Sequence, residues 1–243
     1  MTYCVGLWLE QGLVMLSDTR TNAGVDNISI FSKMYTAIAP GERMLCMLAA
    51  GNLAITQAVW NRLGEGVMLE GERHTLLTVP SMFRAAQLVG AAIRAVYEVD
   101  GAMLKAQGVG FDVSVMLGGQ IAGGPQRLYL VYAAGNFIEA TPDTPFLQIG
   151  EHKYGKPILD RALTHQTGLE DGMKLTLVSM DSTLRSNLTV GLPLDLLVYE
   201  AGTQQIRLQR RITEEDPYFR ALREDWSTAL RDAYRRMPAP GWL

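Results

Sequence analysis

The first strands of the chain are visible in its alternation of apolar and polar positions. Residues 3–9 alternate along their length, Glu10-Gln11-Gly12 has the composition of a turn, and residues 13–16 resume an apolar run. This pattern predicts an antiparallel β-hairpin that ends at Ser17-Asp18. The polar loop 19–24 then follows, and residues 28–35 are expected to return as a strand that carries Lys33.

The remaining apolar segments divide into strands and helices. Short runs rich in strand-forming residues predict strands at 44–50, 112–117, 127–133, 146–149, 194–199 and 206–212. Apolar residues three or four positions apart predict helices at 52–63, 82–96, 156–163, 169–184 and, as an amphipathic C-terminal helix, about 217–236. This order favours two stacked antiparallel sheets covered by outer helices, an α+β arrangement, over regular βαβ crossovers.

Composition narrows the class of protein. The chain has 243 residues, of which 48% are hydrophobic, with 22 Lys and Arg against 25 Asp and Glu. We expect one globular domain over 1–243, because no Pro-, Ser- or charge-rich linker interrupts it. The slight acidic excess, without a basic stripe, argues against nucleic-acid binding. No apolar window reaches the ~18 residues of a membrane span and no signal peptide is apparent, so a cytoplasmic location is expected.

Neither metal nor cofactor chemistry is indicated. The three histidines, His74, His152 and His165, are not spaced with carboxylates or cysteines as metal ligands. The sequence contains no G-x-S-x-G elbow, and its Gly-rich turn at 118–125 is not followed by GK[ST] or by a helix. Cys4 and Cys46 lie in apolar runs and are expected to be buried free thiols in a reducing compartment. We therefore expect no metal and no cofactor.

The candidate chemistry lies at the start of the sequence. Met1-Thr2 is followed at once by the first strand. An initiator methionine is removed when the next residue is small, which would give Thr2 a free α-amino group beside its hydroxyl. An α-amino group titrates near ~7.7 to 8.0, so part of it is neutral at pH 7 and can accept a proton. Thr2 would then supply both a nucleophile and a base, although a Met-Thr start alone is also consistent with ordinary processing.

Two charged residues are expected beside this threonine. Antiparallel pairing across the first hairpin returns Asp18 to the neighbourhood of Thr2. Lys33 lies among apolar residues and needs a partner if it is buried, which Asp18 would provide. A Thr2–Asp18–Lys33 constellation is therefore predicted, and a purely structural ion pair is the alternative interpretation.

Several separate segments resemble the proteasome β-subunit family of N-terminal nucleophile hydrolases, in particular its bacterial branch of ancestral β-subunits, Anbu. They are MTYCVG at 1–6, LSDTRTNAG at 16–24, AGNLA at 50–54, IGE at 149–151 with YGKPILD at 154–160, and DSTLRSN at 181–187. The resemblance implies a four-layer αββα sandwich. It also implies threonine peptidase or amidase activity on a peptide or amide substrate, in a homo-oligomeric ring or spiral.

The resemblance also assigns roles at the predicted site. Thr2 resembles the nucleophile, and Asp18 and Lys33 resemble its supporting pair. A backbone N–H at Leu48 or Ala49 resembles the donor that stabilises the oxyanion. Proteasomes typically have glycine at this position, which neither residue is, but a backbone donor requires no particular side chain.

Three supporting positions differ from the proteasome pattern. Glu151 stands where proteasomes typically carry serine beside the terminal amine, Ser186 where relatives have aspartate, and Thr189 where they have serine. The Glu151 carboxylate would raise the pKa of the amine and reduce the supply of neutral base at pH 7.

These departures leave a second reading open. The chain would then be a non-catalytic assembly subunit that keeps the proteasome scaffold. Between the two readings lies a specialised amidase that acts on a peptide tag or isopeptide. The sequence has no nucleotide motif, so any ATP use would belong to a separate partner protein. The resemblance implies a peptide-ligase protein as the alternative partner.

Overall fold

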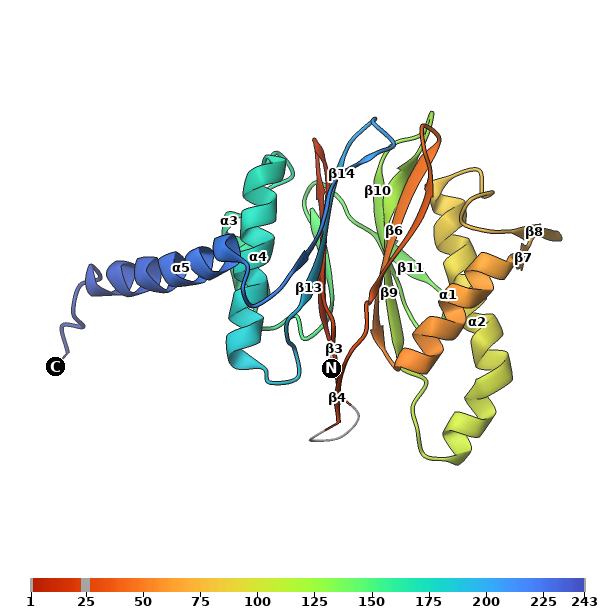
Figure 1. Cartoon of the computed structure of the whole chain (residues 1–243), viewed down its shortest axis with the longest axis horizontal. Coiled ribbons are helices and arrows are strands. Elements are labelled where there is room, and N and C mark those ends of the chain that lie inside the picture. Colours follow the sequence, from red (N-terminus) through yellow and green to blue (C-terminus); the bar gives the residue numbers. More distant parts are fainter. Residues whose placement is uncertain (1, 23–26, 243) are drawn as a thin grey trace.

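Two five-stranded antiparallel sheets stack face to face in the computed structural model, which describes residues 2–22 and 27–242 (Figure 1). In spatial order the first sheet contains β12 (Phe146–Gly150), β1 (Tyr3–Leu9), β2 (Gly12–Asp18), β13 (Leu194–Glu200) and β14 (Ile206–Ile212). The second contains β11 (Phe137–Glu139), β10 (Arg127–Val131), β9 (Val113–Ile121), β6 (Arg43–Gly51) and β5 (Met34–Ala39). The expected pair of stacked antiparallel sheets is confirmed.

Helices cover the outer faces of both sheets. On the first sheet lie α3 (Lys156–Ala162) and α4 (Leu169–Ser186), and α5 (Pro217–Arg235) begins beside α4. On the second lie α1 (Leu53–Glu65) and α2 (Met82–Ala106). Two short ribbons complete the fold, β3 (Arg20–Asn22) with β4 (Ile28–Ile30), and β7 (Val67–Leu69) with β8 (Glu72–His74). The order of layers is therefore αββα.

Three apolar clusters hold these layers together. One lies between the two sheets, and one lies under each helical layer. Gly6 of β1 allows a close approach between the sheets, since a Cβ there would collide with the Met116 sulfur. β1 lies between β2 and β12, and all of its residues except Trp8 are buried. The segment that follows Thr2 is therefore fixed in the middle of the molecule.

The prediction of one continuous strand at 28–35 is wrong, because this segment contains the end of one strand and the start of another. β4 ends at Ile30, and the Phe31 N–H then donates to the Thr19 carbonyl (2.9 Å). β5 begins at Met34, which pairs with Leu48 in the other sheet. The chain crosses from a ribbon beside the first sheet to the edge of the second, so one continuous strand cannot serve both. Lys33 lies in this crossing segment.

Within the described part of the chain, no helix is long and apolar enough to cross a membrane. In the same residues, Cys4 and Cys46 are buried and form no disulfide. No group of three or more His, Cys, Asp or Glu residues there is arranged to hold a metal ion.

Asp216 fixes the start of α5 and provides a test of this helix. Its carboxylate accepts from the Phe219 N–H (2.9 Å) and pairs with Arg210 (2.6 Å), and these contacts lower its pKa below the ordinary value. We expect Asp216→Ala to reduce the free energy of unfolding by about 1 kcal/mol, and Asp216→Asn by less because asparagine also caps helices. The pKa is lowered in the folded state, so the ionic part of this stabilisation is present above the unfolded pKa of about 3.9 and lost as pH falls through the folded pKa.

Urea denaturation of these two variants at pH 7 and near pH 3 checks this prediction. The difference between wild type and Asp216→Ala should shrink at the lower pH. An equal difference at both pH values would contradict a charged cap.

Candidate active site

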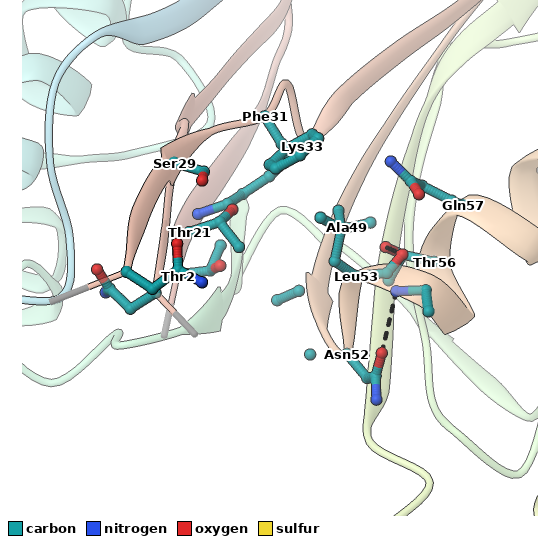
Figure 2. Close-up of a pocket in the computed structure, with 15 residues that line it drawn as sticks. Thr2, Thr21, Ser29, Phe31, Lys33, Ala49, Asn52, Leu53, Thr56 and Gln57 are labelled. Atoms are coloured by element: carbon teal, nitrogen blue, oxygen red, sulfur yellow. Dashed lines mark hydrogen bonds between the residues drawn. The ribbon is translucent and has the colours of Figure 1, made fainter. Parts of the chain in front are cut away.

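Thr2 lies at a pocket of about 620 Å³ between the two sheets (Figure 2). One wall comes from the β3–β4 ribbon and the segment that leads to Lys33. The opposite wall comes from the end of β6 and the first turn of α1, including Ala49, Leu53 and Gln57. Asn52 caps α1 through its side-chain oxygen, which accepts from the Ala54 N–H (3.0 Å). This cap fixes the connection between β6 and α1, which forms this wall of the pocket.

Strand pairing on one side holds Thr2 in place. Thr2 is 6% exposed, and its carbonyl accepts from the Glu151 N–H (2.7 Å). The next residue, Tyr3, pairs with Gly150 in β12. Gly150 has a φ of +80°, and a Cβ there would overlap the Thr2 carbonyl, so glycine is required at this close approach. These backbone contacts position the threonine directly before the start of β1.

Asp18 and Lys33 meet as the sequence predicts. Lys33 Nζ donates to Asp18 Oδ1 (2.7 Å) and to the Arg20 carbonyl (2.6 Å), and only 5% of Lys33 is exposed. The Tyr3 N–H also donates to Asp18 Oδ1 (3.1 Å), which links the pair to the residue after Thr2. In Figure 2 the ammonium end of Lys33 points toward Thr2. The structure brings Thr2, Asp18 and Lys33 together at one pocket.

Burial and charge act in opposite directions on Asp18. Burial raises the pKa of the carboxyl, and the Lys33 ammonium and the N–H groups of Tyr3 and Gly191 counteract this effect. Three donors contact the two carboxylate oxygens, an arrangement that stabilises the ionised form of Asp18. The pair can thus keep a positive charge beside Thr2 although both groups are shielded from water.

The nearest thiol is a poor competitor for Thr2. Cys4 is fully buried, and burial raises the pKa of its thiol well above the ordinary value. Because the thiolate is the reactive form, this group stays unreactive at neutral pH. Its sulfur lies 3.8 Å from the Ala49 carbonyl, as a weak donor in the core between the sheets.

The two predicted oxyanion donors belong to the β6 ladders. The Ala49 N–H donates to the Lys33 carbonyl (3.0 Å). Because successive residues of a strand point to opposite neighbours, the Leu48 N–H points toward β9. By the same alternation the Gly51 N–H points in the same direction as the Ala49 N–H, away from β9, and Gly51 lines the pocket. The oxyanion role stays a prediction, and the sequence interpretation did not consider Gly51.

The other three predicted residues occupy different places. Glu151 is half-buried and touches Thr2 through its backbone N–H. Ser186 is the exposed last residue of α4, and the Thr189 hydroxyl donates to Asn187 Oδ1 (2.5 Å). Among the described residues, neither of these two side chains shares a hydrogen bond with Thr2, Asp18 or Lys33.

The loop after α4 supports the site through its backbone instead. The Gly191 N–H donates to Asp18 Oδ2 (3.3 Å), and Arg20 donates to the Leu188 carbonyl (2.9 Å). A Cβ on Gly191 would overlap the Arg20 guanidinium. Sequence reasoning missed Gly191 and Arg20, because a backbone donor and a carbonyl acceptor leave no residue-type signal.

Polar side chains that were also missed line the pocket. Thr21, Asn22, Ser29, Thr56 and Gln57 are among them. The Thr21 hydroxyl is buried, and it has no hydrogen-bond partner in the part of the chain that the structure describes. A pocket with this lining can exchange hydrogen bonds with a polar ligand such as an extended peptide.

The two stacked sheets, the outer helices and a threonine at the start of a central strand define a proteasome-related N-terminal nucleophile hydrolase fold. Comparison with solved structures then identifies the branch. Anbu from Pseudomonas aeruginosa is 51% identical, with a TM-score of 0.92 over 99% of this chain and 98% of that chain. Anbu from Yersinia bercovieri is 46% identical, with a TM-score of 0.91 over 99% and 100%.

A third structure, a mutant of Anbu from Hyphomicrobium sp. strain MC1, is 49% identical, with a TM-score of 0.91 over 99% of both chains. The chain belongs to the Anbu family, the ancestral β-subunits. No family model and no curated protein sequence matches it.

Proposed function

We propose that this protein is an N-terminal threonine hydrolase that cleaves an amide bond in a peptide or amide substrate. The observation that carries the proposal is the buried Asp18–Lys33 pair beside Thr2. Thr2 and Lys33 both line the 620 Å³ pocket at the start of β1. Removing two charged groups from water is costly, and buried charges of this kind are concentrated at functional sites, which favours a role for the Lys33 ammonium beside Thr2.

The proposed reaction starts from a chain whose first residue is Thr2, after removal of Met1; Met1 itself lies outside the described residues. The Thr2 hydroxyl attacks the carbonyl carbon of the substrate, and its proton passes to the Thr2 amine directly or through water. The tetrahedral oxyanion is stabilised by a backbone N–H at the end of β6. The amine then protonates the leaving nitrogen, and water hydrolyses the resulting ester and restores the hydroxyl.

Lys33 has an electrostatic role in this scheme. Its ammonium favours the partial negative charge that develops on the Thr2 oxygen during attack. Asp18 does not touch the substrate; it holds Lys33 and, through the Tyr3 N–H, the start of β1. Glu151 directly follows β12, and its backbone N–H contacts Thr2; we assign to its carboxylate the task of holding the protonated amine between steps.

We also propose that the chain works as a homo-oligomer, in a ring or a spiral. One solved relative supports this, because the Pseudomonas aeruginosa protein is described as a helical assembly of the Anbu complex. A site enclosed by several copies would limit access to extended chains.

A non-catalytic assembly subunit is the second candidate. The Ala49 N–H, one of the two predicted oxyanion donors, already donates to the Lys33 carbonyl. Within residues 2–22 and 27–242, the Ser186 and Thr189 side chains make no hydrogen bond to Thr2, Asp18 or Lys33. A scaffold that no longer needs catalysis would tolerate both features.

Chain processing separates the two candidates. We expect a fusion with a leader that a specific protease removes directly before Thr2 to be unreactive toward a β-lactone electrophile. The cleaved protein should gain the mass of one lactone, located on Thr2 by peptide mapping. N-terminal sequencing of the protein made without a leader should begin at Thr2. Equal labelling before and after cleavage, or no labelling of the cleaved chain, would overturn the hydrolase proposal.

A further inference from the structure

A second cleft adjoins the pocket that contains Thr2. It has a volume of about 350 Å³ and is formed by the first turn of α1 and the last turns of α2. Asn52 and Ala54 line both cavities, so the two meet over the beginning of α1. In Figure 1 the start of α1 and the end of α2 lie at the same end of the molecule as the N-terminus. A ligand that is bound at Thr2 can therefore extend into this cleft.

Part of the cleft is apolar. Ile55 of α1 is buried, and Leu104 of α2 is half-buried against the apolar cluster under this helical layer. Met103 of α2 is 67% exposed and also lines the cleft. A methionine side chain is flexible and adapts to apolar groups of different shapes. Together these side chains form a surface on which the methylene groups of a long side chain can pack.

The charge in the cleft is negative. Asp100 of α2 is the only charged residue among those that line it in the described part of the chain. Its side chain is exposed, and it makes no salt bridge with any residue that the structure describes. The backbone carbonyls at the end of α2, near Ala106, add a partial negative charge. Lys105 lies in the same turn but does not line the cleft. The cleft therefore favours a positively charged group.

The pocket at Thr2 has a different charge. Among the residues described, no carboxylate lines it, and its one ammonium group, Lys33, is already paired with Asp18. A basic side chain of a peptide therefore finds no free carboxylate next to Thr2, but it finds Asp100 in the adjoining cleft. An extended chain advances about 3.3 Å per residue, so a cleft that shares residues with the pocket is reached within a few residues.

We infer that the cleft between α1 and α2 is a second substrate-binding site, which holds a lysine or arginine side chain of the peptide a few residues from the bond that is cleaved. This inference rests on the proposed function and adds to it a preference for basic residues at a distance from that bond. The stem of the side chain packs on Met103 and Leu104, and its positive end lies beside Asp100. Asp100 thus acts on binding and not on the chemical step.

Peptide binding to a protein that cannot react tests this site. In Thr2→Ala a bound peptide stays intact, and fluorescence anisotropy measures its affinity. A short labelled peptide of uncharged residues is compared with versions that carry one lysine, moved along the peptide position by position. We expect lysine at one or two neighbouring positions to tighten binding about two- to five-fold, the range of an exposed ion pair. An equal gain at every position, or no gain at any position, would overturn the inference.

Norleucine and glutamate at the preferred position separate the contribution of the stem from that of the charge. Norleucine keeps the apolar stem of lysine without the ammonium, so we expect the affinity to fall in the order lysine, norleucine, glutamate. At about 1 M salt the lysine and norleucine peptides should become similar, because the Debye length is then about 3 Å. Equal affinities for the lysine and glutamate peptides at low salt would contradict a role for Asp100.

Charge reversal tests Asp100 itself. In Asp100→Lys we expect the order to reverse, so that the glutamate peptide binds more tightly than the lysine peptide. Glu98→Lys is the matched control, because it makes the same change on the same helix at an exposed residue that does not line the cleft. Each variant replaces one negative charge with a positive one and shifts the net charge from −3 to −1, so a general attraction of basic peptides would weaken equally in both. A reversal in both variants, or in neither, would remove Asp100 from the site.

Failure of this site and failure of the proposed function give different results. If no peptide binds to Thr2→Ala, a peptide is not the substrate, and the cleft has no such role either. If peptides bind without a preference for lysine, only the inference about the cleft is wrong. β-Lactone labelling of the parent protein at Thr2 reports on the hydrolase chemistry independently of both outcomes.

Discussion

Replacement of Thr2 by alanine is expected to abolish covalent labelling and to reduce any amidase activity by about 10³-fold or more. The alanine chain keeps its terminal amine but has no oxygen that can attack a carbonyl. The fold should be unchanged, because Thr2 is held through its backbone carbonyl, which accepts from Glu151. Intact-mass measurement after β-lactone treatment, with denaturation curves in parallel, checks both expectations.

The matched control for this experiment is Thr2→Ser. Serine keeps the hydroxyl and is also small enough for methionine removal, so labelling should persist. Undiminished turnover by the alanine variant would assign the reaction to another group. Loss of labelling in both variants, with the fold intact, would show that the threonine methyl group is needed to orient the oxygen.

Removal of the Lys33 ammonium is expected to affect stability and chemistry together. Lys33→Met leaves the Asp18 carboxylate buried, with only two backbone donors, and should destabilise the protein by about 3–5 kcal/mol. The variant should also lose labelling at Thr2, because no positive charge then stabilises the negative charge that develops on the Thr2 oxygen during attack. Urea denaturation and lactone labelling measure the two effects separately.

A double variant separates the two roles. In Asp18→Asn/Lys33→Met the buried charges are both gone, so most of the stability should return. Labelling should not return, because the ammonium is still absent. Recovery of labelling with stability would show that the ion pair is only structural and would remove Lys33 from the proposed mechanism.

The sequence predicts the layers and the central pair well because both follow from local patterns. Alternation in the first hairpin places Asp18 opposite the start of β1, and a lysine among apolar residues indicates a buried partner. The crossing at Phe31 and Ser32 was not predicted. Residues 28–35 have a strand-like composition throughout, and only contacts distant in sequence, from Thr19 and Leu48, reveal where the strand breaks.

The supporting groups of the site were harder to predict. Gly191 contributes through its backbone N–H group, which every residue except proline possesses, so residue type carries no signal. Arg20 contributes a carbonyl to Lys33 as well as its guanidinium to the loop after α4. The departures from the proteasome pattern at Ser186 and Thr189 are easier to see in the sequence, but Ser186 is exposed and the Thr189 hydroxyl donates to Asn187.

The central position of β1 has a consequence for how substrate is accommodated. Its amides are held between β2 and β12 and should exchange with solvent only when the whole molecule unfolds. In the proposed reaction, the attacking oxygen of Thr2 is therefore attached to the start of a rigid strand. Any adjustment to ligands of different size must come from the two walls of the pocket, the β3–β4 ribbon on one side and the first turn of α1 on the other.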